Sequence, residues 1–171
     1  MVRIRAGRLA DAVAAARLER SISAVPGLLV AHPTEVRAAY QKRLIAQARA
    51  RNGVYLVAKD NKRLIGIASL RPMDLRATSH VYRLSIMLEL TYVGQGIGTA
   101  LMKSLLAQAG RMRKLRKIEL LVRASNLRAR RLYEKFGFRI EGRLERRVSL
   151  PDGTFMDDLS MAWFPRKAAR G

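Results

Sequence analysis

Three glycines at alternate positions, Gly94, Gly96 and Gly98, separate an apolar strand-like segment from an amphipathic helical one. Glycine lets the backbone approach a bulky anion and adopt positive φ angles. The first turn of the helix that follows has N–H groups without internal partners, and its dipole favours negative charge. The segment therefore predicts a receptor for a phosphate or pyrophosphate. The alternative is a tight strand-to-helix turn that binds no ligand.

The glycine spacing does not fit two common phosphate loops. A Walker loop continues with Lys and then Ser or Thr after its last glycine, whereas Thr99 and Ala100 follow Gly98. A dinucleotide-binding fold usually opens with its glycine loop and has an acidic residue after the next strand. Here three or four predicted strands precede the loop, and Arg123 ends the next strand.

Elsewhere the chain divides into strand-like and helix-like segments by its hydrophobic periodicity, caps and turn residues. We expect strands at 2–5, 54–58, 64–70, 82–90, 117–122, 139–150 and 155–164, and helices at 10–22, 34–51, 99–112 and 126–136. This order predicts an α/β layered domain with a partly antiparallel sheet of six to seven strands and about four flanking helices. We expect one domain over 1–164 and a basic tail over 165–171.

The charge of the chain is strongly positive, because 34 Lys and Arg residues stand against 13 Asp and Glu, a net charge of +21. Such a field attracts nucleic acids, acidic protein surfaces and phosphorylated ligands. Composition alone does not choose among these partners.

Other features of the composition exclude several kinds of site. The chain has no cysteine, which rules out disulfides and thiolate zinc sites and fits a reducing compartment. With His32 and His80 as its only histidines, we expect no metal site. We find no membrane-spanning run and no apolar signal-peptide core, and so expect a cytoplasmic protein with no membrane contact.

Two motifs resemble the GCN5-related N-acetyltransferase (GNAT) family. The glycine loop resembles the family's acyl-coenzyme A loop, in which Arg or Gln is followed by two residues, Gly, one residue, and Gly or Ala. Gly96 and Gly98 match the two small positions, whereas Val93 replaces Arg or Gln. Residues 126–138 resemble the family's Asn-x-x-Ala-x-x-Leu-Tyr-x-x-x-Gly-Phe run. The closing strands look most like the amino-acid and ribosomal-protein acetyltransferase branch.

The resemblance implies acetyl-coenzyme A (acetyl-CoA) as co-substrate and assigns most of its contacts. It implies that loop backbone N–H groups hold the pyrophosphate, namely those of Gly94, Gly96, Ile97, Gly98 and Thr99. Gln95 is a candidate donor in place of the missing Arg or Gln. An oxyanion donor is expected among the backbone N–H groups near Met87, Leu88 and Leu90, and Asn126 is expected to contact the pantetheine arm or an ordered water.

Basic side chains are expected at the far end of the cofactor. Arg128, Arg131 and Lys135 follow Asn126 on the same predicted helix and suit the 3′-phosphate and adenine end by geometry. Residues 111–117 are a second candidate cradle, with a solvated helix end as the alternative. The charge exceeds what one cofactor needs, which leaves an RNA or acidic-protein contact as a further hypothesis.

The catalytic residues are assigned as an acid and a base. By resemblance Tyr133 is the acid, since a phenol of pKa ~10 can donate to a thiolate whose thiol has pKa ~8.5. The alternative is that Tyr133 only completes the core. Glu89 is the expected base, and a solvent-facing Glu89 without a role is its rival. The weaker candidates for the base are Glu35, His80, Asp157 and Asp158.

The sequence thus predicts an N-acetyltransferase that moves acetyl from acetyl-CoA to a primary amine. The acceptor is expected to be an amino acid, a small amine or a protein N-terminus, and residues 24–36 are expected to shape its pocket. The alternative is an acyl-CoA fold that serves as a nucleic-acid- or ribosome-associated module with weak or no catalysis. The family resemblance also makes a homodimer an expectation.

Overall fold

The computed structural model describes residues 1–50 and 52–165. Its first half consists of β1 (Val2–Ala6), α1 (Ala12–Ser23), α2 (Ala38–Ala50), β2 (Val54–Asp60), β3 (Arg63–Pro72) and β4 (Val81–Leu88). Its second half consists of α3 (Ile97–Ala109), β5 (Lys117–Arg123), α4 (Leu127–Lys135), β6 (Arg139–Ser149) and β7 (Phe155–Trp163). Short 3-10 helices lie at Leu9–Asp11, Arg76–Thr78 and Leu90–Tyr92.

The strands form one seven-stranded sheet in the order β1-β2-β3-β4-β5-β7-β6. Each neighbouring pair is antiparallel except β4 and β5, which are parallel. The expected fold class, a mixed and partly antiparallel sheet with flanking helices, is therefore confirmed. The one parallel pair is where the site is built.

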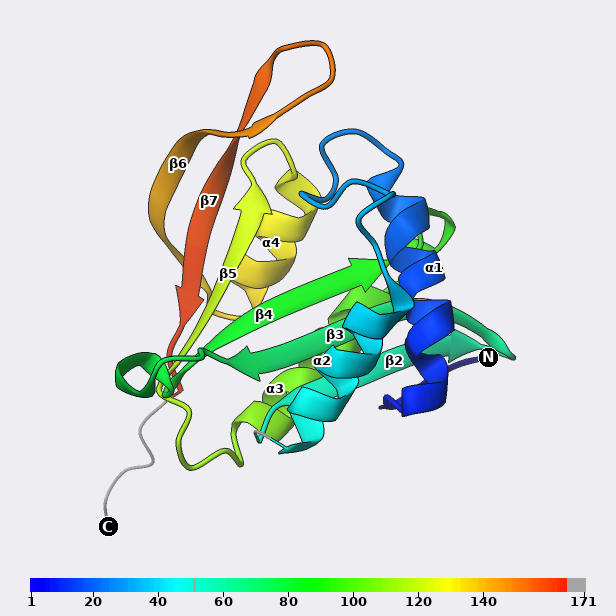
Figure 1. Cartoon of the computed structure of the whole chain (residues 1–171). Helices are drawn as coiled ribbons and strands as arrows, with labels where there is room; N and C mark the ends of the chain where they lie inside the picture. The colour runs from blue at the N-terminus through cyan, green and yellow to red at the C-terminus, as the bar shows by residue number, and fades with distance from the viewer. Residues whose placement is uncertain (51, 166–171) are drawn as a thin grey trace.

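The two parallel strands stay together only at their beginning. Residues Val81–Arg83 of β4 pair with Lys117–Glu119 of β5, and no further pair is formed between them in the described chain. Figure 1 shows the two strands leaving a common point and diverging toward their carboxyl ends. Backbone groups on the facing edges of the strands beyond that point are left without a strand partner.

The helices cover the sheet on both faces, as Figure 1 shows for α1 and α2 in front and α3 behind β2, β3 and β4. Each face has its own apolar core. On one face α1 and α2 pack through Leu18, Ile22 and Ile45 against β2 and β3. On the other face Leu101, Met102 and Leu105 of α3 pack against the sheet, together with Tyr133 of α4.

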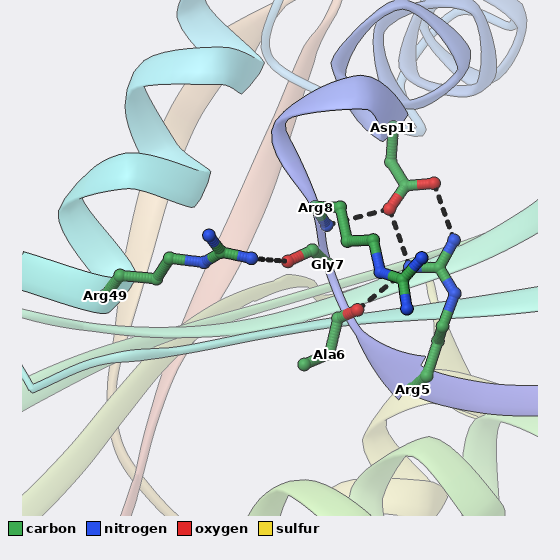
Figure 2. Close-up of polar contacts among 6 residues, drawn as sticks. All are labelled: Arg5, Ala6, Gly7, Arg8, Asp11 and Arg49. Carbon is green, nitrogen blue, oxygen red and sulfur yellow. Dashed lines mark hydrogen bonds and ion pairs between the residues drawn. The ribbon is translucent and has the colours of Figure 1, made fainter.

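Partly buried polar contacts fix the connection from β1 to α1 (Figure 2). The Arg5 guanidinium donates to both carboxylate oxygens of Asp11, at 2.7 and 2.8 Å, and the Arg8 backbone N–H donates to the same carboxylate at 2.8 Å. Arg49 of α2 donates to the Gly7 carbonyl oxygen at 3.3 Å. The hydrogen bond from Arg5 is the main cause of the lowered pKa of Asp11. This carboxylate therefore ties the first strand to the first helix.

Several predicted bounds were wrong, and the largest differences concern three elements. The helix expected from residue 34 begins at Ala38, because His32 and Glu35 close a turn through the Glu35 N–H to His32 carbonyl bond of 2.9 Å. The strand expected to reach residue 90 ends at Leu88, since the chain enters a 3-10 turn. The helix expected from Thr99 begins at Ile97, with Gly96 as its N-cap, and ends at Ala109. Residues 51 and 166–171, which include most of the expected tail, lie outside the described residues.

Candidate active site

A cavity of about 510 Å³ lies where β4 and β5 diverge. Its walls come from both faces of the sheet: the connection between α1 and α2, the second half of β4, the glycine loop, the end of β5, α4 and one residue of β7. Residues from both faces of the sheet therefore meet in one cavity.

The glycine loop forms one wall with its backbone exposed. Gly94 and Gly96 have φ angles of 93° and 80°, in the left-handed region that side chains other than glycine rarely adopt. A Cβ atom added at either residue would meet no atom within 4 Å, so the space in front of the loop is open. The helix α3 starts directly behind the loop, and its unpaired N–H groups make the wall suited to an anion.

Asn126 and Tyr133 lie across the cavity on α4. The Asn126 side-chain oxygen accepts from the Ala129 backbone N–H at 3.0 Å, which caps α4 and leaves the side-chain amide donor free to face the cavity. Tyr133 is only 6% exposed and packs against Phe138. Burial raises the pKa of its phenol, so the hydroxyl keeps its proton at neutral pH.

The comparison with known families decides what this arrangement is. A model of the acetyltransferase (GNAT) family matches residues 23–138, which include the glycine loop and the Asn126 motif. The chain belongs to the GNAT family. It is therefore an N-acetyltransferase, and the resemblance of its two motifs to this family is confirmed.

Individual relatives of the GNAT chain agree with this assignment. It is 27% identical over 135 residues to the L-amino acid N-acetyltransferase AaaT of Escherichia coli strain K12, and the match covers 79% of this chain and 80% of that protein. A GNAT acetyltransferase of Streptococcus pneumoniae superposes with a TM-score of 0.87, at 26% identity and with 96% and 99% of the two chains covered. The yncA protein of Salmonella typhimurium, solved with acetyl-CoA, has the same fold at a TM-score of 0.87, 17% identity and coverage of 98% and 96%.

The cavity of this GNAT enzyme brings together most of the residues predicted from the sequence. Those that line it are Met87, Leu88, Leu90, Gly94, Gly96, Gly98, Thr99, Asn126, Arg128 and Tyr133. Ile97 instead turns its side chain into the core, and Arg131 and Lys135 are exposed on α4 and are not part of the cavity wall. Gln95 donates to the Thr91 carbonyl oxygen at 3.0 Å, so in this structure its amide closes the loop and does not line the cavity.

The strand register narrows the set of candidate oxyanion donors. The Glu89 N–H donates to the Ile65 carbonyl oxygen at 2.8 Å, toward β3. Because backbone groups of a strand alternate in direction, Met87 also faces β3, whereas Ile86 and Leu88 face the gap beside β5. Of the predicted donors, Leu88 therefore has its N–H directed into the gap, as does Ile86, which was not predicted, and Met87 contributes its side chain to the cavity wall.

Glu89, the expected base, is engaged elsewhere. Its carboxylate forms an ion pair with Arg63 of β3 and accepts from the Thr91 hydroxyl at 3.3 Å. The residue is not part of the cavity wall. Its role as base stays a prediction without support from this geometry.

A buried ion pair that includes Asp158, one of the weaker candidates for the base, does reach the cavity. Asp158 of β7 pairs with Arg123 of β5, and the two side chains are 1% and 8% exposed. Asp158 is the only carboxylate among the described residues of the cavity wall, and its Oδ2 atom is buried without a hydrogen-bond partner there. Arg123 Nε also donates to the Gly27 carbonyl oxygen at 2.9 Å, which holds the α1–α2 connection over the site.

Proposed function

We propose that this GNAT enzyme transfers the acetyl group of acetyl-CoA to the α-amine of an amino acid. The observation that carries the proposal is the cavity between β4 and β5, which has an anion-binding loop on one side and a buried carboxylate on the other. The L-amino acid acetyltransferase relative supports an amino acid as the acceptor class.

The residues present fit acetyl-CoA. The open space before Gly94 and Gly96 admits a bulky diphosphate, and the N–H groups of Ile97, Gly98 and Thr99 begin a helix that favours its charge. Asn126 and the Leu88 backbone are suited to the amide groups of the pantetheine arm and to the thioester oxygen. Arg128 lies at the cavity, with Arg131 and Lys135 beyond it on α4, where they suit the 3′-phosphate.

The chain's own groups account for the proton movements. The acceptor amine forms the new C–N bond and loses a proton, which Asp158 Oδ2 is placed to accept because it is the unpartnered carboxylate oxygen of the wall. As the C–S bond breaks, the Tyr133 hydroxyl donates its proton to the leaving sulfur. Solvent then takes the proton from Asp158 and returns one to Tyr133, so a neutral amine is acetylated with no net release of protons.

Acceptors with different amine pKa values make different demands on this base. An α-amine of pKa ~8 is partly neutral at neutral pH, whereas a lysine side chain of pKa ~10.4 is almost fully charged. Asp158 is already paired with Arg123 and is better suited to accept a proton from the forming adduct than from a free ammonium. This favours the α-amine acceptor.

The alternative of a non-catalytic nucleic-acid module is not favoured by the family match or by the relatives. An RNA contact, a homodimer and a cytoplasmic location stay predictions from the sequence. Of the described helices, none combines the length and apolar character needed to cross a bilayer.

Release of free thiol from acetyl-CoA, measured across amino acids, peptides with free N-termini and ribosomal proteins, tests the proposal. We expect release with free amino acids and its loss in Tyr133→Phe. Thiol release with ribosomal proteins alone would indicate that the acceptor is a protein N-terminus. No thiol release with any amine would contradict the proposal.

A further inference from the structure

A second cavity, of about 260 Å³, lies on the α2 side of the sheet. It shares Leu84, Ser85, Met87 and Leu121 with the first cavity, so the two are neighbours across a common wall. An acceptor whose amine reaches the thioester from this side of the sheet therefore has room to place the rest of the molecule in the second cavity.

Two pairs of polar side chains line this second cavity on adjacent strands. Ser69 of β3 is paired in register with Ser85 of β4, and Arg71 with Arg83 in the next position on the same face. Side chains directly opposite on antiparallel strands lie about 5 Å apart, and like charges there destabilise the sheet. Within residues 1–50 and 52–165, none of these four side chains has a hydrogen bond or ion pair.

Two carboxylates that lie beside this cavity or opposite Arg83 in register are engaged by other groups. Glu119 of β5 lies opposite Arg83 in register, but its carboxylate is paired with Lys117 at 2.8 Å. Glu19 lines the same cavity and accepts from Gln41 at 2.5 Å, and its burial raises its pKa. The cavity therefore presents two unpaired guanidinium groups and two free hydroxyl groups to whatever enters it.

We propose that Arg71 and Arg83 bind the free carboxylate of the acceptor, with Ser69 and Ser85 as additional donors. Guanidinium groups recognise carboxylates through paired charge-assisted hydrogen bonds. Ser85, on the wall shared with the reaction cavity, is two residues from Arg83, about 6.8 Å along the strand, a span that an extended arginine side chain covers. The inference rests on the proposed function and specifies it: the enzyme selects amines that carry a carboxylate.

The test pairs each amino acid acceptor with its amide, for example leucine with leucinamide, in the thiol-release assay. We expect the wild type to prefer the acid. Arg71→Gln and Arg83→Gln should each raise KM for the acid and lower kcat/KM about 10- to 100-fold, while the activity toward the amide changes little. Arg3→Gln, which removes an exposed arginine of β1 outside both cavities, is the matched control and should behave as the wild type.

A second readout does not depend on turnover. Calorimetric titration with N-acetylleucine reads carboxylate binding directly, and it should weaken in Arg71→Gln and Arg83→Gln while the affinity for acetyl-CoA stays the same. Equal activity on acids and amides, unaffected by either substitution, would overturn this inference and leave the proposed function intact. Absence of thiol release with every amine would overturn the proposed function, and with it this inference.

Discussion

At the scale of single residues, the Tyr133 hydroxyl is a group that can be removed with little loss of packing. Phe keeps the ring against Phe138, so Tyr133→Phe should lower kcat about 100-fold or more by removing the acid. The affinity for acetyl-CoA and the melting temperature should change little. Tyr82→Phe, at a buried tyrosine outside both cavities, is the control. Parallel losses of kcat and of cofactor affinity in Tyr133→Phe would mean that the tyrosine is structural.

Asp158 combines a structural and a chemical role, and two variants separate them. Asp158→Asn leaves Arg123 buried without its charge partner and should cost about 3–5 kcal/mol of unfolding free energy. The double change Arg123→Met with Asp158→Leu should recover much of that stability in urea unfolding, because an apolar pair needs no charge partner. Thiol release should be lost in the single variant and should not return in the double variant, because both lack the Asp158 carboxylate. An active double variant would exclude Asp158 as the proton acceptor.

Asp11 makes the stability of the fold depend on pH. Its pKa is lowered in the folded state, chiefly by the hydrogen bond from Arg5, so the unfolded chain binds the proton more tightly. The stabilisation that the ionised Asp11 carboxylate gives the fold is fully present above the ordinary carboxyl pKa of 3.8. It is lost as the pH falls through the lower pKa of the folded state. Asp11→Asn should therefore be about 1–3 kcal/mol less stable at pH 7, with a smaller deficit near pH 3 in urea unfolding. A deficit independent of pH would contradict this account.

At the scale of elements, the junction of the glycine loop with α3 depends on backbone conformation. Gly96 caps α3 at a φ of 80°, and a side chain there costs about 1–2 kcal/mol even where space is open. Gly96→Ala should also place a methyl group in front of the loop and weaken acetyl-CoA binding measured by calorimetry. The same change at Gly153, at a φ of 82° in the β6–β7 turn, should cost similar stability without affecting binding.

The elements themselves could be predicted because their periodicity is local. The strand at 54–58, the hairpin that follows and the helix at 126–136 were all expected and are present. The start of α2 was predicted too early because Thr34 resembles a helix cap. In the structure a turn between His32 and Glu35 includes Thr34, and the helix begins only after it. The divergence of β4 and β5 could not be read from the residues, since it depends on which strands become neighbours.

The residues of the site likewise fall into those that local motifs predict and those that only the strand pairing brings together. The glycine loop and the Asn126–Tyr133 helix are each contiguous motifs, so the sequence was enough to predict that they line one site. Arg123 and Asp158 are 35 residues apart and meet only because β7 lies beside β5 in register. The Arg71–Arg83 pair likewise exists only through the pairing of β3 with β4.

At the scale of the whole molecule, the net charge of +21 creates a field that favours an anionic cofactor. Raising the ionic strength from 0.1 to 1 M shortens the Debye length from about 10 to 3 Å. The affinity for acetyl-CoA should therefore fall roughly tenfold over this range, as measured by equilibrium titration. Dephospho-acetyl-CoA, which lacks the 3′-phosphate, is the control and should show a weaker dependence. Equal dependence for both would mean that the basic surface does not sense that phosphate.

Within residues 1–50 and 52–165, the three residue pairs that join β4 to β5 are the only strand pairing between two halves of the sheet, β1–β4 and β5–β7–β6. A joint at one end acts as a hinge, so a small rotation of one half about it displaces the opposite end of the gap most. The apolar core on the α3 side contains residues of both halves, such as Leu84 of β4 and Leu120 of β5, so any such rotation must repack that core. The width of the gap is thus tied to the packing of the core that both halves share.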